Sequence, residues 1–243
     1  MIGVSALHAE WTKVRTVPGT IWLLLGTVAL TVLLGALATN AMAPGGDPAE
    51  SALTGVALGQ AIVVILAVAM VSGEYATGMI HTSLIAVPKR LDMLAAKGIV
   101  VSALVLVAGT VAVLGSIVVG LLALPDLTLT GPVLRASVGS VLYLALIGLL
   151  SLGLAVVVRD AAAAIGVVLG LLYLTPIVTT LVSDPDWHDR LRRLSPMTAG
   201  LAVQSTVDVV AQPVGPWEGL GVLAGWAAAA LLAGAAVLRL RDA

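Results

Sequence analysis

Six long stretches of the 243-residue sequence contain no charged residue, and they constrain the fold more than any other feature. Each is at least 20 residues long, and they cover residues 16–46, 51–73, 98–125, 136–158, 161–183 and 219–238. A helix of about 20 apolar residues crosses the roughly 30 Å hydrocarbon core of a bilayer. The strands of a membrane barrel alternate apolar with polar residues instead, and these stretches do not. The sequence therefore predicts six transmembrane helices.

The composition supports an all-α membrane protein in which residues 1–243 form a single transmembrane domain. The chain has only 12 Lys+Arg and 13 Asp+Glu residues, too few to cover the surface of a soluble domain of this size. The net charge of −1 offers no basic face to a nucleic acid. The sequence has no cysteine, which excludes disulfides and thiolate metal sites. A soluble enzyme, a disordered chain and a nucleic-acid binder are therefore excluded.

The predicted spans follow from these uncharged stretches, and their orientation follows from the basic residues between them. The spans lie near residues 19–41, 52–73, 98–123, 134–157, 161–182 and 218–238. The first is longer than the apolar core of about 7–15 residues in a cleaved signal peptide, so we expect it to be retained. With the N-terminus inside, eight of the 12 basic residues fall on the cytoplasmic side. This count predicts a plasma-membrane protein with both termini in the cytoplasm.

Residues 1–17 are predicted to form an amphipathic helix on the cytoplasmic surface. Val4, Leu7, Trp11 and Val14 recur at helical spacing and form its apolar face. The polar remainder consists of His8, Glu10, Lys13 and Arg15. Trp favours the headgroup level, and basic side chains favour an anionic leaflet. A frayed leader is the alternative interpretation of this segment.

Residues 183–216 are predicted to be an extracellular loop with two short helices. The Ser-Asp-Pro sequence at 183–185 is typical of a helix start, and this helix would end at Leu194. The Ser-Pro sequence at 195–196 starts a second helix in the same way, which would continue toward Val207. We expect both helices to pack over the outer mouth of the bundle.

The segment between the second and third spans points to a family. From Gly73 to Val100 the chain reads GEYATGMIHTSLIAVPKRLDMLAAKGIV. This segment resembles the type-2 family of ATP-binding-cassette (ABC) transporter permeases. The family pattern has an acidic-aromatic pair, a Gly-Thr-Ile sequence, a basic turn after proline, and a lysine entering the third span. Its counterparts here are Glu74-Tyr75, Gly78-Met79-Ile80, Pro88-Lys89-Arg90 and Lys97, with Met79 in place of the threonine.

The resemblance extends to other parts of the chain. Glu10-Trp11-Thr12-Lys13 is similar to the surface helix of actinobacterial members of this family. The six-span layout, the inner loop after the second span and the large outer loop after the fifth also fit the family. The resemblance implies the permease subunit of an exporter for an amphipathic compound such as a drug, antibiotic, peptide or lipid.

The same resemblance implies partners. Six spans are half of the usual twelve, so a second permease copy is expected, as a homodimer or a heterodimer. The phosphate-binding pattern GxxxxGK[ST] is absent from this sequence. The energy would therefore come from a separate ATPase subunit that binds ATP and Mg, while this chain binds no cofactor and is not an enzyme.

Residues 74–97 are predicted to be the cytoplasmic coupling segment. A short helix near residues 77–86 would dock into a groove of the ATPase, with Leu84 and Ile85 as apolar anchors and Lys89 and Arg90 at the rim. The predicted coupling residues are Glu74, Tyr75, Gly78, Met79, Ile80, Leu84, Ile85, Pro88, Lys89 and Arg90. Alternatively, the charges in this segment are ordinary interfacial charges that determine topology.

The spans themselves offer few candidate functional groups. The middle of each predicted span lacks Asp, Glu, Lys, Arg and His, which favours an external energy source over proton coupling. The weak candidates for a substrate path are Gln60, Tyr173, Thr175 and Thr179. For Gln60, hydrogen bonding across helices is favoured over a place in the substrate path. Pro176 is expected to bend the fifth span, and Gly-xxx-Gly pairs at 55/59, 166/170 and 221/225 are candidates for close helix packing.

Two other functions fit the same six spans. The chain would be a self-contained carrier or channel if the inner loop were a plain connection. It would be a membrane-embedded sensor or immunity protein if it bound a ligand without moving it. The permease interpretation depends on the resemblance of the inner loop, and the two alternatives do not.

Overall fold

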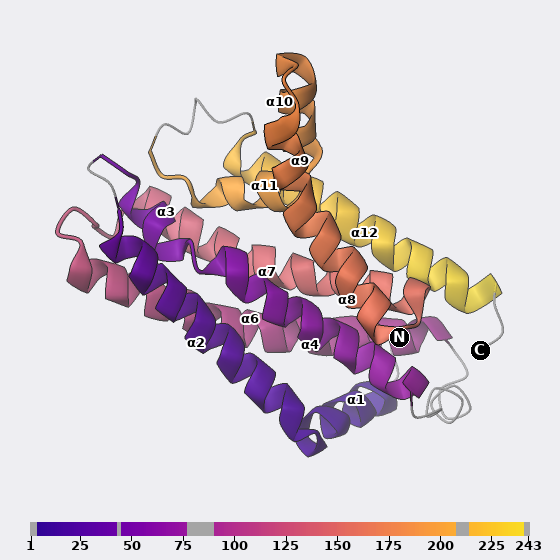
Figure 1. Cartoon of the computed structure of the whole chain (residues 1–243). Coiled ribbons are helices and arrows are strands. Elements are labelled where there is room, and N and C mark those ends of the chain that lie inside the picture. The colour runs from indigo at the N-terminus through magenta and orange to yellow at the C-terminus, as the bar shows by residue number, and fades with distance from the viewer. Residues whose placement is uncertain (1–3, 43–44, 77–89, 208–213, 241–243) are drawn as a thin grey trace.

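The computed structural model of the chain describes residues 4–42, 45–76, 90–207 and 214–240 (Figure 1). Every regular element in these ranges is a helix. Six helical segments are long and apolar enough to cross a membrane: Pro18–Asn40, Pro48–Gly73, Leu91–Ala123, Gly131–Val158, Ala161–Leu181 and Pro216–Leu240. The predicted all-α membrane fold with six spans is confirmed, and the protein is a multi-pass membrane protein.

The elements follow one another along the chain as alternating spans and short helices. Their bounds are α1 Val4–Thr16, α2 Pro18–Asn40, α3 Pro48–Leu53, α4 Val56–Ala76, α6 Arg90–Ala123, α7 Gly131–Val158, α8 Ala161–Leu169, a π-helical turn Gly170–Leu174, α9 Thr175–Leu181, α10 Pro185–Leu194, α11 Pro196–Leu201, a 3₁₀ turn Ala202–Gln204, and α12 Pro216–Leu240. The second span is thus broken after α3, and the third begins earlier than predicted.

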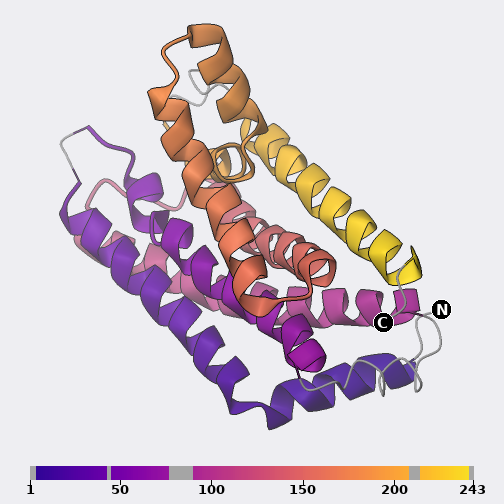
Figure 2. The same cartoon turned by 45° about the vertical axis from the view of Figure 1, so that its right-hand side comes forward.

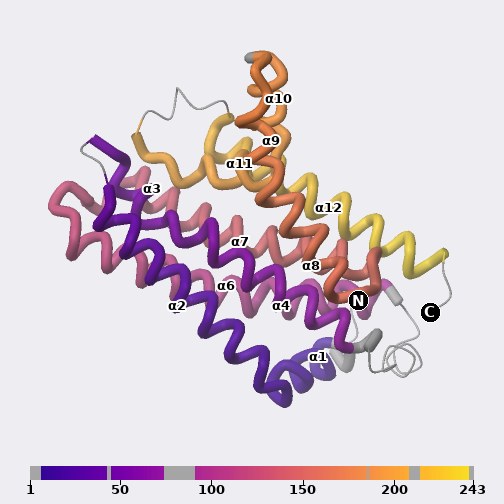
Figure 3. Tube along the Cα trace, viewed as in Figure 1, coloured from indigo at the N-terminus to yellow at the C-terminus, as the bar shows by residue number. Residues whose placement is uncertain are grey.

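The spans run alternately in opposite directions around α7, which packs against α4, α6, α8 and α12 (Figures 1 and 2). Fully buried Tyr143, Leu144, Ile147 and Leu150 make α7 the centre of the core. The start of α2 and the end of α12 lie at one end of the bundle, which we call the α1 end. The opposite end, where α3 and α11 lie, is called the α11 end (Figure 3).

The helix α2 is more apolar on its exposed side than on its buried side. The large side chains that it exposes are Ile21, Trp22, Leu25, Leu33 and Leu37. The residues that it buries are Thr20, Thr27, Thr31, Gly35 and Thr39. In water this arrangement would be strongly unfavourable, whereas lipid solvates apolar side chains as well as a protein core does. The exposed side of α2 therefore faces lipid.

Glycines allow the backbones of α2, α3 and α4 to touch. A Cβ atom at Gly55 would lie 1.9 Å from the Thr31 carbonyl oxygen, and one at Gly59 would lie 2.1 Å from Thr31 Oγ1. A Cβ at Gly35 would in turn lie 2.3 Å from the Ala52 carbonyl oxygen. Real Cβ atoms do not approach so closely, so these positions require glycine. The Gly55/Gly59 pair is thus confirmed as a packing seam.

The other two predicted glycine pairs do not pack helices together within the described part of this chain. A Cβ at Gly166, Gly221 or Gly225 would meet no described atom within 4 Å. A Cβ at Gly170 would approach only Leu174 of the same span. Spacing alone suggested these pairs, but spacing does not reveal which face of a helix meets a neighbour. A packing role for the pairs at 166/170 and 221/225 therefore stays a prediction.

The fifth span is irregular around its proline. The π-helical turn immediately precedes Thr175 and Pro176, where the proline removes a backbone donor. The Thr175 hydroxyl donates to the Leu171 carbonyl oxygen. A threonine thus satisfies a carbonyl of this disrupted turn.

The two short helices between the fifth and sixth spans start where the sequence predicts. The Asp184 carboxylate caps α10 by accepting from the Asp186 and Trp187 backbone N–H groups at 2.9 and 3.3 Å. Ser195 is the N-cap residue of α11. The second helix ends at Leu201, however, and not near Val207. It is also inserted into the bundle, because Gly200 packs on the Tyr143 ring.

Asp47 explains why the chain leaves the helical conformation before Val207. Its carboxylate caps α3 through the Ala49 and Glu50 backbone N–H groups. It also accepts from the Thr206 backbone N–H and hydroxyl groups and, at 2.9 Å, from the Val207 N–H. These amides therefore bond to Asp47 and not to carbonyls of a continuing helix. We call this contact the Asp47 clasp.

The Asp47 clasp should open when its carboxylate is removed. We expect Asp47→Ala to increase amide hydrogen exchange at Thr206 and Val207 by about tenfold or more, since charge-assisted hydrogen bonds are each worth about 1.5–3 kcal/mol. Exchange is measured by mass spectrometry on the protein in detergent. The control is Asp126→Ala, at an exposed turn of the same end of the bundle. Equal exchange in both variants would refute the clasp.

Acid should open the Asp47 clasp in the unmodified protein. Burial acts to raise the pKa of Asp47, but hydrogen bonds from Thr206, Glu50 and Val207 outweigh it and hold the pKa below the usual 3.8. The clasp therefore contributes its full stability above pH 3.8 and loses it as the pH falls through the lower, folded pKa. Exchange at Val207, corrected for the intrinsic effect of pH, should stay constant down to about pH 4 and rise only below it.

Candidate functional site

The described residues cover only the two ends of the predicted coupling segment. Glu74 and Tyr75 lie in the last turn of α4, and Arg90 is the first residue of α6. Residues 74–76 and 90–97 are therefore helical. The predicted helix at 77–86 lies outside the described residues, as do Gly78, Met79, Ile80, Leu84, Ile85, Pro88 and Lys89. The coupling role of these residues stays a prediction.

A buried ion pair lies next to the helices that flank this segment. Lys97 of α6 is only 2% exposed, and its Nζ donates to Glu10 Oε2 at 2.9 Å. The same Nζ donates to the Met70 carbonyl oxygen of α4 at 3.2 Å. Glu10 is 5% exposed, and its Oε1 accepts from Lys13 Nζ at 3.0 Å. We call these four residues the ion-pair junction, which joins α1, α4 and α6.

The ion-pair junction corrects the prediction for the N-terminal helix. The helix itself is confirmed as α1, but Glu10 is buried and not part of an exposed polar side. On the predicted apolar face, Trp11 is 47% exposed and Val14 is buried. Glu10 is buried because it pairs with Lys97, since an ammonium buried in an apolar helix needs a carboxylate close by.

One sequence signal pointed toward this junction without identifying the partner. Lys97 stands seven residues beyond the start of α6 and is followed by a long uncharged stretch, so a counter-charge was needed. With the N-terminus inside, Glu10, Glu74, Asp92 and Asp160 would all lie on the same side of the membrane as Lys97. The choice of Glu10 depends on how α1 packs, which local sequence does not specify.

The candidate substrate-path residues fall into two groups. Gln60 is fully buried, and its Nε2 donates to the Ala57 carbonyl oxygen at 2.8 Å. The Tyr173 hydroxyl donates to the same oxygen at 2.7 Å, so the structure brings Gln60 and Tyr173 together. Thr175 and Thr179 instead donate to carbonyl groups of their own span. A role of these residues in a transport path stays a prediction.

The cluster around Gln60 holds α11 in the bundle. The Tyr143 hydroxyl donates to Gln60 Oε1, and Gln60 Nε2 also lies 3.4 Å from Met197 Sδ of α11. Just beyond α11, Gln204 Nε2 donates to Ser140 Oγ of α7 at 3.0 Å. Hydrogen bonding across helices, one of the two roles expected for Gln60, is therefore confirmed.

The contacts at both sites join helices to one another. The ion-pair junction fixes three helices to one another at the α1 end, and the Gln60 cluster fixes α11 at the opposite end. Within the described ranges, no group of three or more His, Asp or Glu side chains is arranged to hold a metal ion. The junction is the site nearest the predicted coupling segment.

Comparison with known proteins adds no family assignment. The sequence matches no family model, and no curated protein matches it significantly.

Proposed function

We propose that the protein is the membrane-spanning permease subunit of an ABC exporter. It moves an amphipathic compound, such as a drug, antibiotic, peptide or lipid, with energy from a separate ATPase subunit that binds ATP and Mg. The protein lies in the plasma membrane with both termini in the cytoplasm, and a second permease copy completes the transport path. The similarity of residues 73–100 to type-2 permeases and the six-span fold support this proposal.

The single observation that carries the proposal is the ion-pair junction. A permease driven by an ATPase needs firm attachment between the docking segment and the spans that must move. Lys97 and Met70 lie on α6 and α4, the two helices that flank the predicted docking segment, and both are bonded at the junction. A displacement of α4 or α6 would therefore move the other of these two helices, and α1 with them.

Changes in the docking segment should separate ATP hydrolysis from transport. We expect Glu74→Ala or Gly78→Pro to abolish stimulation of the ATPase by substrate while the six-span bundle stays folded. The reason is that the docking contact transmits the signal, whereas packing of the spans does not depend on it. The measurement is ATPase activity of the purified complex in proteoliposomes, with unfolding in detergent as the check on folding.

The control and the partner test use the same preparation. Asp126→Ala, at the α11 end, should keep normal stimulation. Purification from the native host in mild detergent should recover an ATPase in stoichiometric amount with this chain. Recovery of the chain alone would argue strongly against the proposal, as would normal stimulation in the Gly78→Pro variant. Substrate flux through liposomes that contain only this chain would favour a self-contained carrier or channel instead.

A further inference from the structure

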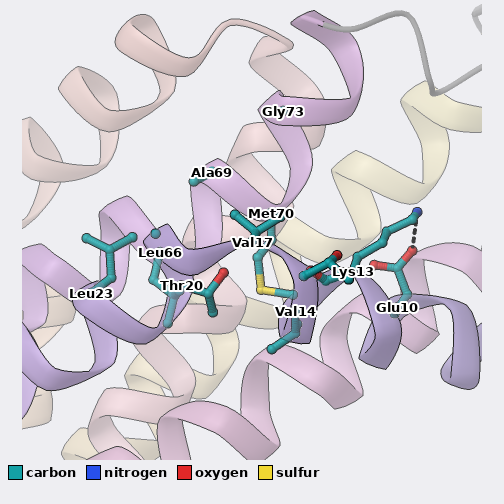
Figure 4. A pocket seen from close by; sticks show the side chains of 12 residues that line it. Glu10, Lys13, Val14, Val17, Thr20, Leu23, Leu66, Ala69, Met70 and Gly73 are labelled. Carbon is teal, nitrogen blue, oxygen red and sulfur yellow. Dashed lines mark hydrogen bonds and ion pairs between the residues drawn. The ribbon is translucent and has the colours of Figure 1, made fainter.

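A cavity of about 500 Å³ lies beside the ion-pair junction, between α1, α2 and α4 (Figure 4). Its walls are mainly apolar side chains: Val14, Val17, Leu23, Leu66, Ala69 and Met70. Glu10 and Lys13 lie at one end of the cavity, and Leu23 lies at the other. The volume falls in the range of about 300–1,000 Å³ that is usual for small-molecule sites. An occupant must therefore be apolar along most of its length and polar at one end.

The position of the cavity indicates where this occupant comes from. Two exposed tryptophans, Trp11 on α1 and Trp22 on α2, are next in sequence to the lining residues Glu10 and Leu23. Tryptophan is enriched at the boundary between headgroups and hydrocarbon. The outward side of α2 faces lipid, so a cavity between α2 and α4 at this depth adjoins acyl chains. Membrane lipid is the amphipathic molecule present at high concentration at this position.

The charge at the polar end favours an anionic headgroup. Lys13 lines the cavity, and its side chain is 33% exposed, with its Nζ donating to Glu10 Oε1 at 3.0 Å. Each basic side chain near an anionic membrane surface contributes about 1 kcal/mol of attraction. A headgroup phosphate beside Lys13 would leave one acyl chain to follow the apolar wall toward Leu23.

We propose that this cavity binds one anionic glycerophospholipid from the adjacent leaflet, with its headgroup at Lys13 and an acyl chain between α2 and α4. The bound lipid would contact Glu10 and Met70, two members of the ion-pair junction, and Gly73 at the end of α4. It would thus stabilise the arrangement of helices next to the predicted coupling segment. The inference concerns this chain alone and does not depend on a partner ATPase.

Native mass spectrometry of the full chain tests the apolar part of the site. The protein is released from nanodiscs that contain equal amounts of dioleoylphosphatidylglycerol and dioleoylphosphatidylcholine, and the retained lipid is counted. We expect one retained phosphatidylglycerol per chain. Ala69→Phe fills the cavity from an exposed position and should lower retention at least about fivefold. The matched control is Ala29→Phe, which lies on the exposed side of α2 outside the cavity and should retain lipid normally.

Two variants that each remove one positive charge test the headgroup assignment. Lys13→Gln should still retain a lipid but should lower the preference for phosphatidylglycerol about fivefold, the ratio that corresponds to about 1 kcal/mol. Arg15→Gln removes the same charge from the same helix but lies outside the cavity lining, so it should keep the preference. Equal retention in the Ala69→Phe and Ala29→Phe variants would overturn the proposal. Equal retention of both lipids by the unmodified chain would overturn it as well.

Discussion

Lys97→Met is expected to destabilise the bundle by about 3–5 kcal/mol, because it leaves the buried carboxylate of Glu10 without the buried ammonium that it contacts. Methionine retains the length and the apolar stem of lysine, so the loss reflects the charge and not a cavity. The change also removes the donor to the Met70 carbonyl oxygen. The measurement is the free energy of unfolding in mixed detergent and SDS micelles.

Two further variants separate charge pairing from general packing. Lys13→Met removes the other ammonium at Glu10, which is partly exposed, and should cost only about 0–1 kcal/mol. Combining Glu10→Leu with Lys97→Met removes both buried charges and should recover most of the stability lost in the single variant. If Lys97→Met and Lys13→Met destabilise the protein equally, the junction does not have the role assigned to it.

Gly55→Ala is expected to be similarly damaging, although it adds only one methyl group. The new Cβ would lie 1.9 Å from the Thr31 carbonyl oxygen and 2.9 Å from the Gly35 nitrogen. Both atoms belong to the α2 backbone, so relief requires a shift of the whole helix and not a rotation of a side chain. Overpacking of this kind costs about 1–3 kcal/mol or more, and we expect the upper end of that range.

Gly221→Ala is the matched control for Gly55→Ala. It makes the same chemical change in a span, but its Cβ would meet no described atom within 4 Å. Alanine also favours the helix by up to about 1 kcal/mol over glycine, so this variant should be neutral or slightly stabilised. Both variants are compared in the same SDS unfolding assay. A difference below about 0.5 kcal/mol between them would contradict the close contact of α2 with α3 and α4.

The elements that local sequence specifies could be predicted well. The absence of charge over about 20 residues determines a span, whatever the neighbouring spans are. Asp184 and Ser195, each followed by proline, gave the correct starts of α10 and α11 because helix capping involves only adjacent residues. The end of α11 could not be predicted in this way, since it depends on Asp47, more than 150 residues away in the chain.

The contacts that depend on packing could not be predicted. Glu10 pairs with Lys97, which is 87 residues away in the chain. From the sequence, several other acidic residues were equally available as partners of Lys97. The three glycine pairs have the same spacing, yet among the described residues only Gly55/Gly59 lies on a face that closely meets another helix. The polar side of α1 was assigned from hydropathy, which does not identify a carboxylate that is buried because it pairs with a buried ammonium. In each case the missing information was which helices become neighbours.

The helix α2 exposes its apolar side and buries its more polar side. Different features therefore determine its insertion into the membrane and its packing against the other helices. Its apolar outer side makes insertion favourable without any help from the other spans. Once inserted, α2 gains nothing by hiding leucine, because lipid and protein interior solvate that side chain equally. Its final place is therefore selected by steric fit of threonine and glycine against a facing backbone. Hydropathy decides that α2 is a span, and shape alone decides which way it is turned.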